Sequence, residues 1–329
     1  EEINYVDMIN GKLTFIRKSK TSYPSMIQVV EYNKNGNIND LARGELINIG
    51  MHYILSELVI VDKVDFILLP IGNFDIKYSE LKKKHSDIAA RVGIKNDDTM
   101  FCVSVYEQYY EMMTLAEFLN KNAKTMSINE WKTLLFQIFY TLVKITDKLK
   151  RFRHNMLNLE SIRIYKIPRK HRKEADKYTL GDTIFNVPYY GFEIRITDFD
   201  KSYTSDYVKN KNTGLTSENP YYDIHYICQS LLYVIQSNNI HHVELNKFLG
   251  EIIPEKIRVP KNNFNGLDEA YFETTASIIY TPIMLLKKNN FFASYRHVND
   301  ETISPVENNS DDINKYVGAK DRKSVCRER

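Results

Sequence analysis

Hydrophobic positions in the first hundred residues occur mostly in short runs, and this pattern predicts strands. Residues 12–16 and 26–30 are apolar or β-branched, with turn residues between them, and residues 66–71 and 101–106 resemble buried strands. Residues 45–59 differ, because their large apolar side chains recur at helical spacing without an intervening proline. The first third of the chain therefore predicts strands around one helix.

The pattern becomes helical after residue 110. Thr114 and Glu117 have the spacing of a capping box in front of an apolar run, and Ser127 and Glu130 repeat that spacing. The apolar residues behind the second box follow one face of a long helix that reaches about residue 149. Two consecutive helices are therefore expected here.

Strand-like runs return at residues 162–167 and 192–197. Between them, residues 178–188 have the pattern of a hairpin that turns at a Gly-Asp pair. From residue 221 onward the spacing is helical again. Strands dominate the first part and helices the second, and this order predicts an α+β fold.

Composition narrows the class of protein. The chain has 329 residues, and 45 Lys plus Arg against 42 Asp plus Glu give a formal net charge of +3, too balanced to indicate nucleic acid as the obvious partner. Its three cysteines form no CxxC pair, so a reducing compartment is expected and a cysteine-based zinc site is not. No apolar run has the length of a membrane span. The chain starts without Met or a positively charged leader, and a fragment or processed start with an intracellular location is expected.

Two segments point to a specific chemistry. Residues 152–164 follow the long helix and contain an Arg-His-Asn-Met sequence, and residues 194–200 end in Asp-Phe-Asp after a predicted strand. This order resembles the catalytic and metal-binding loops of protein kinases. The chain is similar to the protein-kinase-like proteins of nucleocytoplasmic large DNA viruses (giant viruses) and, more distantly, to the poxvirus virion kinase. The similarity extends over about residues 25–297 and includes three further segments, at 178–190, 219–226 and 280–292.

The resemblance implies a bilobal protein-kinase-like fold. Residues 1–109 would form a small β-rich N-lobe with one helix, and residues 110–298 a larger, mainly helical C-lobe. Residues 299–329 are polar and without periodicity, so we expect a disordered tail there.

The catalytic loop departs from the kinase pattern. When His154 is aligned with the family histidine, Met156 occupies the position of the catalytic Asp and Ser161 that of the metal-binding Asn. A thioether cannot accept a proton at neutral pH, and a serine hydroxyl is a poor ligand for Mg²⁺. Glu160 is the remaining carboxylate in the loop, and we expect it to face solvent.

The predicted nucleotide site is degenerate as well. Gly11 is the single glycine where a kinase has a glycine-rich loop. The strand that should carry the phosphate-binding lysine offers Gln28 or, in a shifted register, Glu31, and neither is a cation. Glu45 is the candidate for the helix carboxylate that normally pairs with this lysine.

Three residues match the kinase pattern. The resemblance makes Asp198 the metal-loop Asp, either as a residual metal ligand or as a structural residue. It gives Asp223 a role in binding the backbone of the catalytic loop, and it makes His154 a buried structural histidine. Such a pattern is expected of a fold-retaining pseudokinase.

The sequence therefore predicts a viral pseudokinase that serves as an interaction or scaffold module for a viral or host protein and requires no cofactor. The first alternative is an active serine/threonine kinase that uses Mg²⁺ and ATP, with Glu160 or Asp200 replacing the lost groups. The second alternative is a nucleic-acid-associated factor that uses the basic stretch of residues 166–177. An intracellular location is expected, in the host cytoplasm, the viral factory or the virion.

Overall fold

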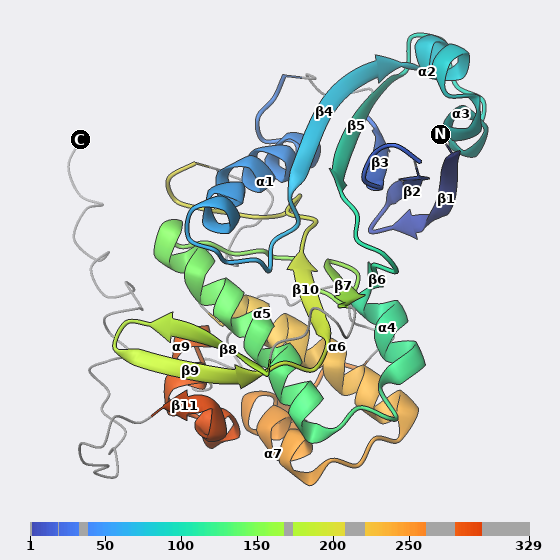
Figure 1. Cartoon of the computed structure of the whole chain (residues 1–329). Helices are drawn as coiled ribbons and strands as arrows, with labels where there is room; N and C mark the ends of the chain where they lie inside the picture. The colour runs from blue at the N-terminus through green and yellow to red at the C-terminus, as the bar shows by residue number, and fades with distance from the viewer. Residues whose placement is uncertain are drawn as a thin grey trace, which may run out of the picture.

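The computed structural model describes residues 2–18, 20–32, 39–167, 174–207, 221–260 and 280–297. It shows a mixed α/β architecture (Figure 1). One sheet and the helix α1 lie in the upper part of Figure 1, and most of the longer helices lie in the lower part. The strand β10 (Phe192–Ile196) lies where the two parts meet.

The largest sheet in the described part of the chain is antiparallel, with the strand order β1-β2-β3-β5-β4. Its strands are β1 (Glu2–Ile9), β2 (Lys12–Lys18), β3 (Ser25–Glu31), β4 (Pro70–Lys77) and β5 (Met100–Glu107). The strands predicted at 12–16, 26–30 and 101–106 are confirmed. The strand predicted at 66–71 is wrong in its position, because β4 begins only at Pro70. Residues 66–68 instead contact β10, where the amide of Leu68 donates to the carbonyl of Ile196 at 3.0 Å.

Three helices accompany this sheet: α1 (Gly44–Ile60), α2 (Tyr78–Lys84) and α3 (Ser86–Val92). The helix predicted at 45–59 is confirmed as α1. Its buried residues Met51 and Leu55 belong to the same hydrophobic cluster as Trp131 and Phe136 of α5 (Ile128–Lys148). The apolar core is therefore continuous between α1 and the helical part of the chain.

The helical part contains α4 (Leu115–Asn122), α5, α6 (Tyr222–Asn238), α7 (Val243–Ile252) and α9 (Pro282–Lys288), with short 3-10 turns at Glu255–Ile257 and Asn290–Tyr295. The capping box of Ser127 and Glu130 at the start of α5 is complete. At α4, the Thr114 hydroxyl accepts the amide of Glu117 at 3.1 Å. Both predicted helix starts are confirmed.

Two small sheets complete the described structure. The first has the order β10-β7-β6 and contains β6 (Met113–Thr114) and β7 (Ile162–Lys166). The second joins the hairpin β8 (Ala175–Leu180) and β9 (Thr183–Pro188) to β11 (Arg296–His297). The predicted hairpin and the predicted strands at 162–167 and 192–197 are confirmed, and β7 pairs with β10 in an antiparallel register.

The predicted tail at 299–329 lies outside the described residues. Within the ranges that the structure does describe, none of the helices combines the length and the apolar character that crossing a bilayer requires.

Candidate functional site

The loop after α5 is fixed to the start of α6 by Asp223. One carboxylate oxygen accepts the amide of His154 at 2.8 Å, and the other accepts the amide of Asn155 at 2.9 Å. The His154 ring is fully buried, and its Nε2 lies 2.9 Å from the carbonyl oxygen of Thr197. The structure thus brings together both residues for which the sequence implied a structural role. Together they connect this loop, α6 and the end of β10.

Asp198 and Phe199 follow β10 and are both fully buried. Asp198 has φ +63°, a left-handed conformation that Asp tolerates better than most residues. The amide of Phe199 donates to Asn48 Oδ1 of α1 at 2.8 Å, and its ring lies 4.9 Å from that of His52 and 5.0 Å from that of His154. The Asp-Phe-Asp segment is therefore held from both parts of the molecule.

Lys12 of β2 is the cation of this site. Its Nζ lies 2.7 Å from Asp198 Oδ1 and also contacts Asp200 Oδ2, and the side chain is about 5% exposed. Sequence reasoning missed Lys12, because the kinase pattern places the phosphate-binding lysine on the next strand. The available signal was the alternation along β2, which puts Lys12 and Thr14 on one face of the strand.

The turn between β1 and β2 contacts the loop after α5. Asn10 and Gly11 have φ +48° and +76°, the conformations of a two-residue hairpin turn. Asn10 Nδ2 donates to Asp198 Oδ2 at 2.8 Å, and Asn10 Oδ1 accepts from Asn158 Nδ2 at 3.1 Å. The two Asp198 oxygens are therefore contacted by side chains from the first hairpin.

The residues predicted to replace the kinase Asp and Asn lie in the same loop. Ser161 is fully buried, and its Oγ lies 2.6 Å from the carbonyl oxygen of Met156. The backbone amide of Met156 donates to His154 Nδ1 at 3.3 Å. Glu160 is exposed, and its carboxylate accepts the Asn10 amide at 3.4 Å. The Ser161 hydroxyl thus donates its hydrogen bond to the backbone of its own loop.

The three residues predicted near the nucleotide contact different partners. Gln28 is buried, and its Nε2 lies 3.4 Å from Asp198 Oδ1. Glu31 forms an ion pair with Lys95 at 2.7 Å, and Glu45 forms one with Arg43 at 3.5 Å. Of the two registers considered, Gln28 is the residue that lies opposite Asp198.

Burial and charge act in opposite directions on the ionisable groups of this site. Burial alone would lower the pKa of Lys12, but the carboxylates of Asp198 and Asp200 hold that pKa well above its usual value. Burial would raise the pKa of Asp198, but Lys12 and Arg163 hold it well below its usual value. The pKa of Asp200 is raised, because its burial and the Asp198 charge outweigh Lys12. The site therefore contains a charged lysine and a charged Asp198.

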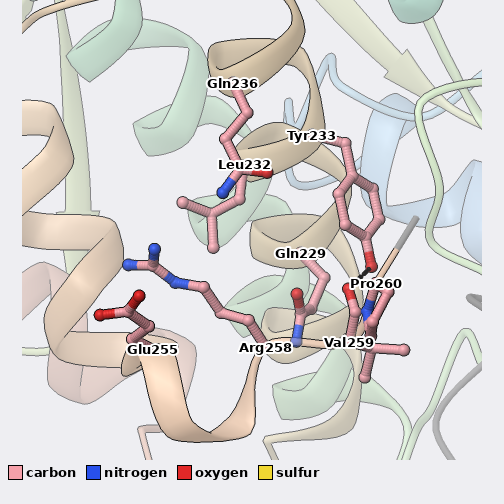
Figure 2. A pocket seen from close by; sticks show the side chains of 8 residues that line it. All are labelled: Gln229, Leu232, Tyr233, Gln236, Glu255, Arg258, Val259 and Pro260. Atoms are coloured by element: carbon pink, nitrogen blue, oxygen red, sulfur yellow. Dashed lines mark hydrogen bonds between the residues drawn. The ribbon is translucent and has the colours of Figure 1, made fainter.

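A separate cavity of about 260 Å³ lies between α6 and the segment that follows α7 (Figure 2). Tyr233 donates its hydroxyl to the carbonyl of Val259 at 2.5 Å, and Gln229 Nε2 donates to the carbonyl of Ile257 at 3.2 Å. These polar groups are thus used in holding the segment against α6. None of the predicted site residues lines this cavity.

Among the described residues, no group of three or more His, Cys, Asp or Glu side chains is arranged to hold a metal ion. The side chains that contact Asp198 are instead Lys12, Asn10 and Gln28, and Lys12 also contacts Asp200. This arrangement can hold the β1–β2 hairpin, the Asp-Phe-Asp segment and the loop after α5 together.

Comparison with known proteins shows what this chain is similar to. The chain resembles the protein-kinase-like proteins of giant viruses. It is 27% identical over 313 residues to "Putative serine/threonine-protein kinase R400" of Acanthamoeba polyphaga mimivirus, across 86% of this chain and 66% of that protein. It is also 27% identical over 257 residues to "Uncharacterized protein R402" of the same virus, across 75% of this chain and 29% of that protein. The chain thus spans less than two thirds of the length of each of these curated relatives.

No family model matches the chain. Among solved structures, "WaaP in complex with acyl carrier protein" aligns with a TM-score of 0.37 and 9% identity, over 88% of this chain and 84% of that one.

Proposed function

We propose that this chain is a bilobal kinase-like protein that does not transfer phosphate and that serves as an interaction module for a protein partner. The β-rich part up to residue 109 would be its N-lobe, and residues 110–298 its C-lobe. The observation that carries the proposal is the contact of Asp198 with Lys12 and Asn10, which directs both of its oxygens to groups of the protein itself.

The loop chemistry supports the same conclusion. At the position proposed for the catalytic base, Met156 offers a thioether that cannot accept a proton at neutral pH. Glu160 is the carboxylate of this loop, and its backbone amide donates to Asn158 Oδ1. Its carboxylate is exposed and accepts the Asn10 amide. Phosphoryl transfer depends on positioning and on charge neutralisation, and this loop supplies neither to a substrate hydroxyl.

The first hairpin supports weak or absent ATP binding. A kinase cradles phosphates with several backbone amides of a glycine-rich loop. Here the connection between β1 and β2 has two residues, and the side chain of Asn10 contacts Asp198 and Asn158. A nucleotide would therefore have to displace these hydrogen bonds before a metal ion on its phosphates could reach Asp198.

An active, divergent serine/threonine kinase is the second candidate. The observation in its favour is that Lys12 supplies a cation beside Asp198, which sequence reasoning had considered lost. In this alternative, Lys12 would leave Asp198 and contact the phosphates when Mg·ATP binds. Asp200 or Glu160 would then have to supply the missing carboxylate.

A radiolabel transfer assay distinguishes the two candidates. The wild type, Met156→Asp, and the triple variant Gln28→Lys, Met156→Asp, Ser161→Asn are incubated with labelled ATP, Mg²⁺ and generic protein substrates. The proposal expects no transfer above background by the wild type or by Met156→Asp, because one restored carboxylate leaves the nucleotide and the metal unbound. Robust wild-type transfer that disappears in an Asp198→Ala control would establish the active kinase instead.

The nucleic-acid alternative receives no further support. Residues 168–173, which hold most of the basic stretch between Lys166 and Lys177, lie outside the described residues. A viral or host protein therefore stays the proposed partner, and an intracellular site of action stays part of the proposal. Salt-sensitive binding of DNA or RNA by the full chain would favour the alternative.

A further inference from the structure

The position of Lys12 between two acidic side chains suggests a role other than phosphate binding. Its ammonium group contacts Asp198 Oδ1 and Asp200 Oδ2, the two carboxylates of the Asp-Phe-Asp segment. The Asp198 side chain is fully buried and that of Asp200 is 19% exposed. The Lys12 charge thus lies between two acidic groups that are largely withdrawn from water.

A divalent cation does not fit these residues as they stand. Mg²⁺ prefers close to ideal octahedral coordination by oxygen, usually with one or two carboxylates and several waters. Asp198 Oδ1 accepts from Lys12 and lies 3.4 Å from Gln28 Nε2, while Oδ2 accepts from Asn10 at 2.8 Å. Ser161 replaces the expected Asn ligand, and its Oγ lies 2.6 Å from the carbonyl oxygen of Met156. Nitrogen donors therefore contact both Asp198 oxygens that a metal would need.

We propose that the Lys12 ammonium replaces the divalent cation of this site, so that the cleft takes up no Mg²⁺ or Mn²⁺ while Lys12 is present. This inference deepens the proposed function, because it rests on Asp198 being the counterpart of the kinase metal-loop Asp. The replacement is covalently attached to β2, and it connects the first sheet to the Asp-Phe-Asp segment without nucleotide or metal.

The electrostatics lead to a specific consequence. Two acidic groups buried side by side need a positive charge, because removing one partner of a buried ion pair leaves an uncompensated charge in a medium of low polarity. Lys12→Met keeps much of the length of the side chain and removes its charge. The variant should then have two adjacent carboxylates without the Lys12 charge between them, an arrangement that a divalent cation can satisfy.

The test is thermal unfolding without nucleotide, in EDTA and in millimolar Mg²⁺ or Mn²⁺. In EDTA, Lys12→Met should unfold about 5 °C or more below the wild type, and the metal should recover at least half of this loss. The wild type should not respond to the metal. Lys77→Met is the matched control, since Lys77 pairs with Asp98 in an exposed ion pair. This control should unfold close to the wild type and should not respond to the metal either.

Two results would overturn the proposal. One is a Lys12→Met variant that folds but gains no stability from Mg²⁺ or Mn²⁺. The other is Mn²⁺ binding by the wild type, followed by electron paramagnetic resonance, with a Kd below about 1 mM that Asp198→Asn abolishes. The second measurement uses the wild type, so it decides the matter even if Lys12→Met does not fold. Because neither measurement contains ATP, metal binding without phosphoryl transfer would overturn this inference and leave the proposed pseudokinase intact.

Discussion

Thr14 of β2 and Gln28 of β3 are direct partners across the first sheet. Side chains alternate along a strand, so Lys12, two residues before Thr14, lies on the same face of the sheet as Gln28. Both side chains reach Asp198 from that face. A register shift by one residue would turn Lys12 to the opposite face, and the buried carboxylates would lose their cation.

The hairpin turn that positions Lys12 should depend on the backbone of Gly11. Gly11 has φ +76°, and a Cβ added there would meet no atom within 4 Å. Gly11→Ala should therefore destabilise the protein through its backbone conformation alone, by about 1 kcal/mol. Chemical denaturation measures this change in the free energy of unfolding.

Gly50→Ala is the matched control for that substitution. Gly50 lies inside α1, and a Cβ added there would also meet no atom within 4 Å. Because alanine is favoured over glycine in a helix, this variant should be more stable by roughly 0.5–1 kcal/mol. Equal effects of the two substitutions, in sign and size, would contradict the turn conformation described here.

Asp223 should contribute strongly to stability through the loop after α5. Asp223→Ala removes the acceptor for the amides of His154 and Asn155, which are both buried. Hydrogen bonds to a charged acceptor are each worth about 1.5–3 kcal/mol, so we expect the loss of both to cost roughly 3–6 kcal/mol. Urea denaturation tests this value. Asp62→Ala, at an exposed position, is the control and should change stability by less than about 0.5 kcal/mol. A loss at Asp223 as small as that of the control would exclude its role in the loop.

His52 should make the stability depend on pH. Burial lowers the pKa of His52 to about 3, and its ring nitrogens contact the Leu68 carbonyl and the Thr197 hydroxyl. A folded-state pKa below the unfolded value of about 6.5 gives stability that is present above pH 6.5 and is lost as the pH falls towards 3. The wild type should therefore lose roughly 2 kcal/mol more than His52→Gln between pH 7 and pH 5.

Denaturation at a series of pH values measures this difference. His241→Gln serves as the control, because His241 is exposed, and it should keep the pH dependence of the wild type. Parallel pH profiles for the wild type and His52→Gln would show that His52 does not carry a lowered pKa in the folded state.

Most of the fold could be predicted from the sequence, because its elements have strong periodic patterns. The helices α1 and α5 and the β7–β10 pair have continuous apolar faces. The strand β1 was missed, since it lies at the edge of its sheet and most of its residues are exposed or half-buried. The run at 66–71 was misplaced, because buried residues such as Phe66 and Ile67 pack into the main core instead of belonging to β4.

The site was predictable only where it follows the kinase pattern. Asp223 accepts the amide of His154, and the His154 ring contacts the Thr197 carbonyl, and both residues were candidates from the resemblance. Lys12 and Asn10 could not be found in this way, because their roles arise from the register of β1, β2 and β3 and from long-range contacts with Asp198. A sequence pattern identifies residue types at fixed spacings, but it does not show which strand supplies a charge to a distant loop.

Calorimetric titration of the wild-type chain with Mg·ATP tests the central claim most directly. The account predicts no measurable binding, or a Kd in the high micromolar range or weaker. Compared with a kinase, the site lacks the glycine-rich phosphate loop, the lysine on β3 and the metal-binding Asn. Losing two or three charge-assisted hydrogen bonds to the nucleotide, of about 1.5–3 kcal/mol each, weakens its binding by roughly two to six decades. A Kd in the low micromolar range would contradict the account, since it would show that Asn10 and Lys12 yield to the nucleotide and that the cleft is open.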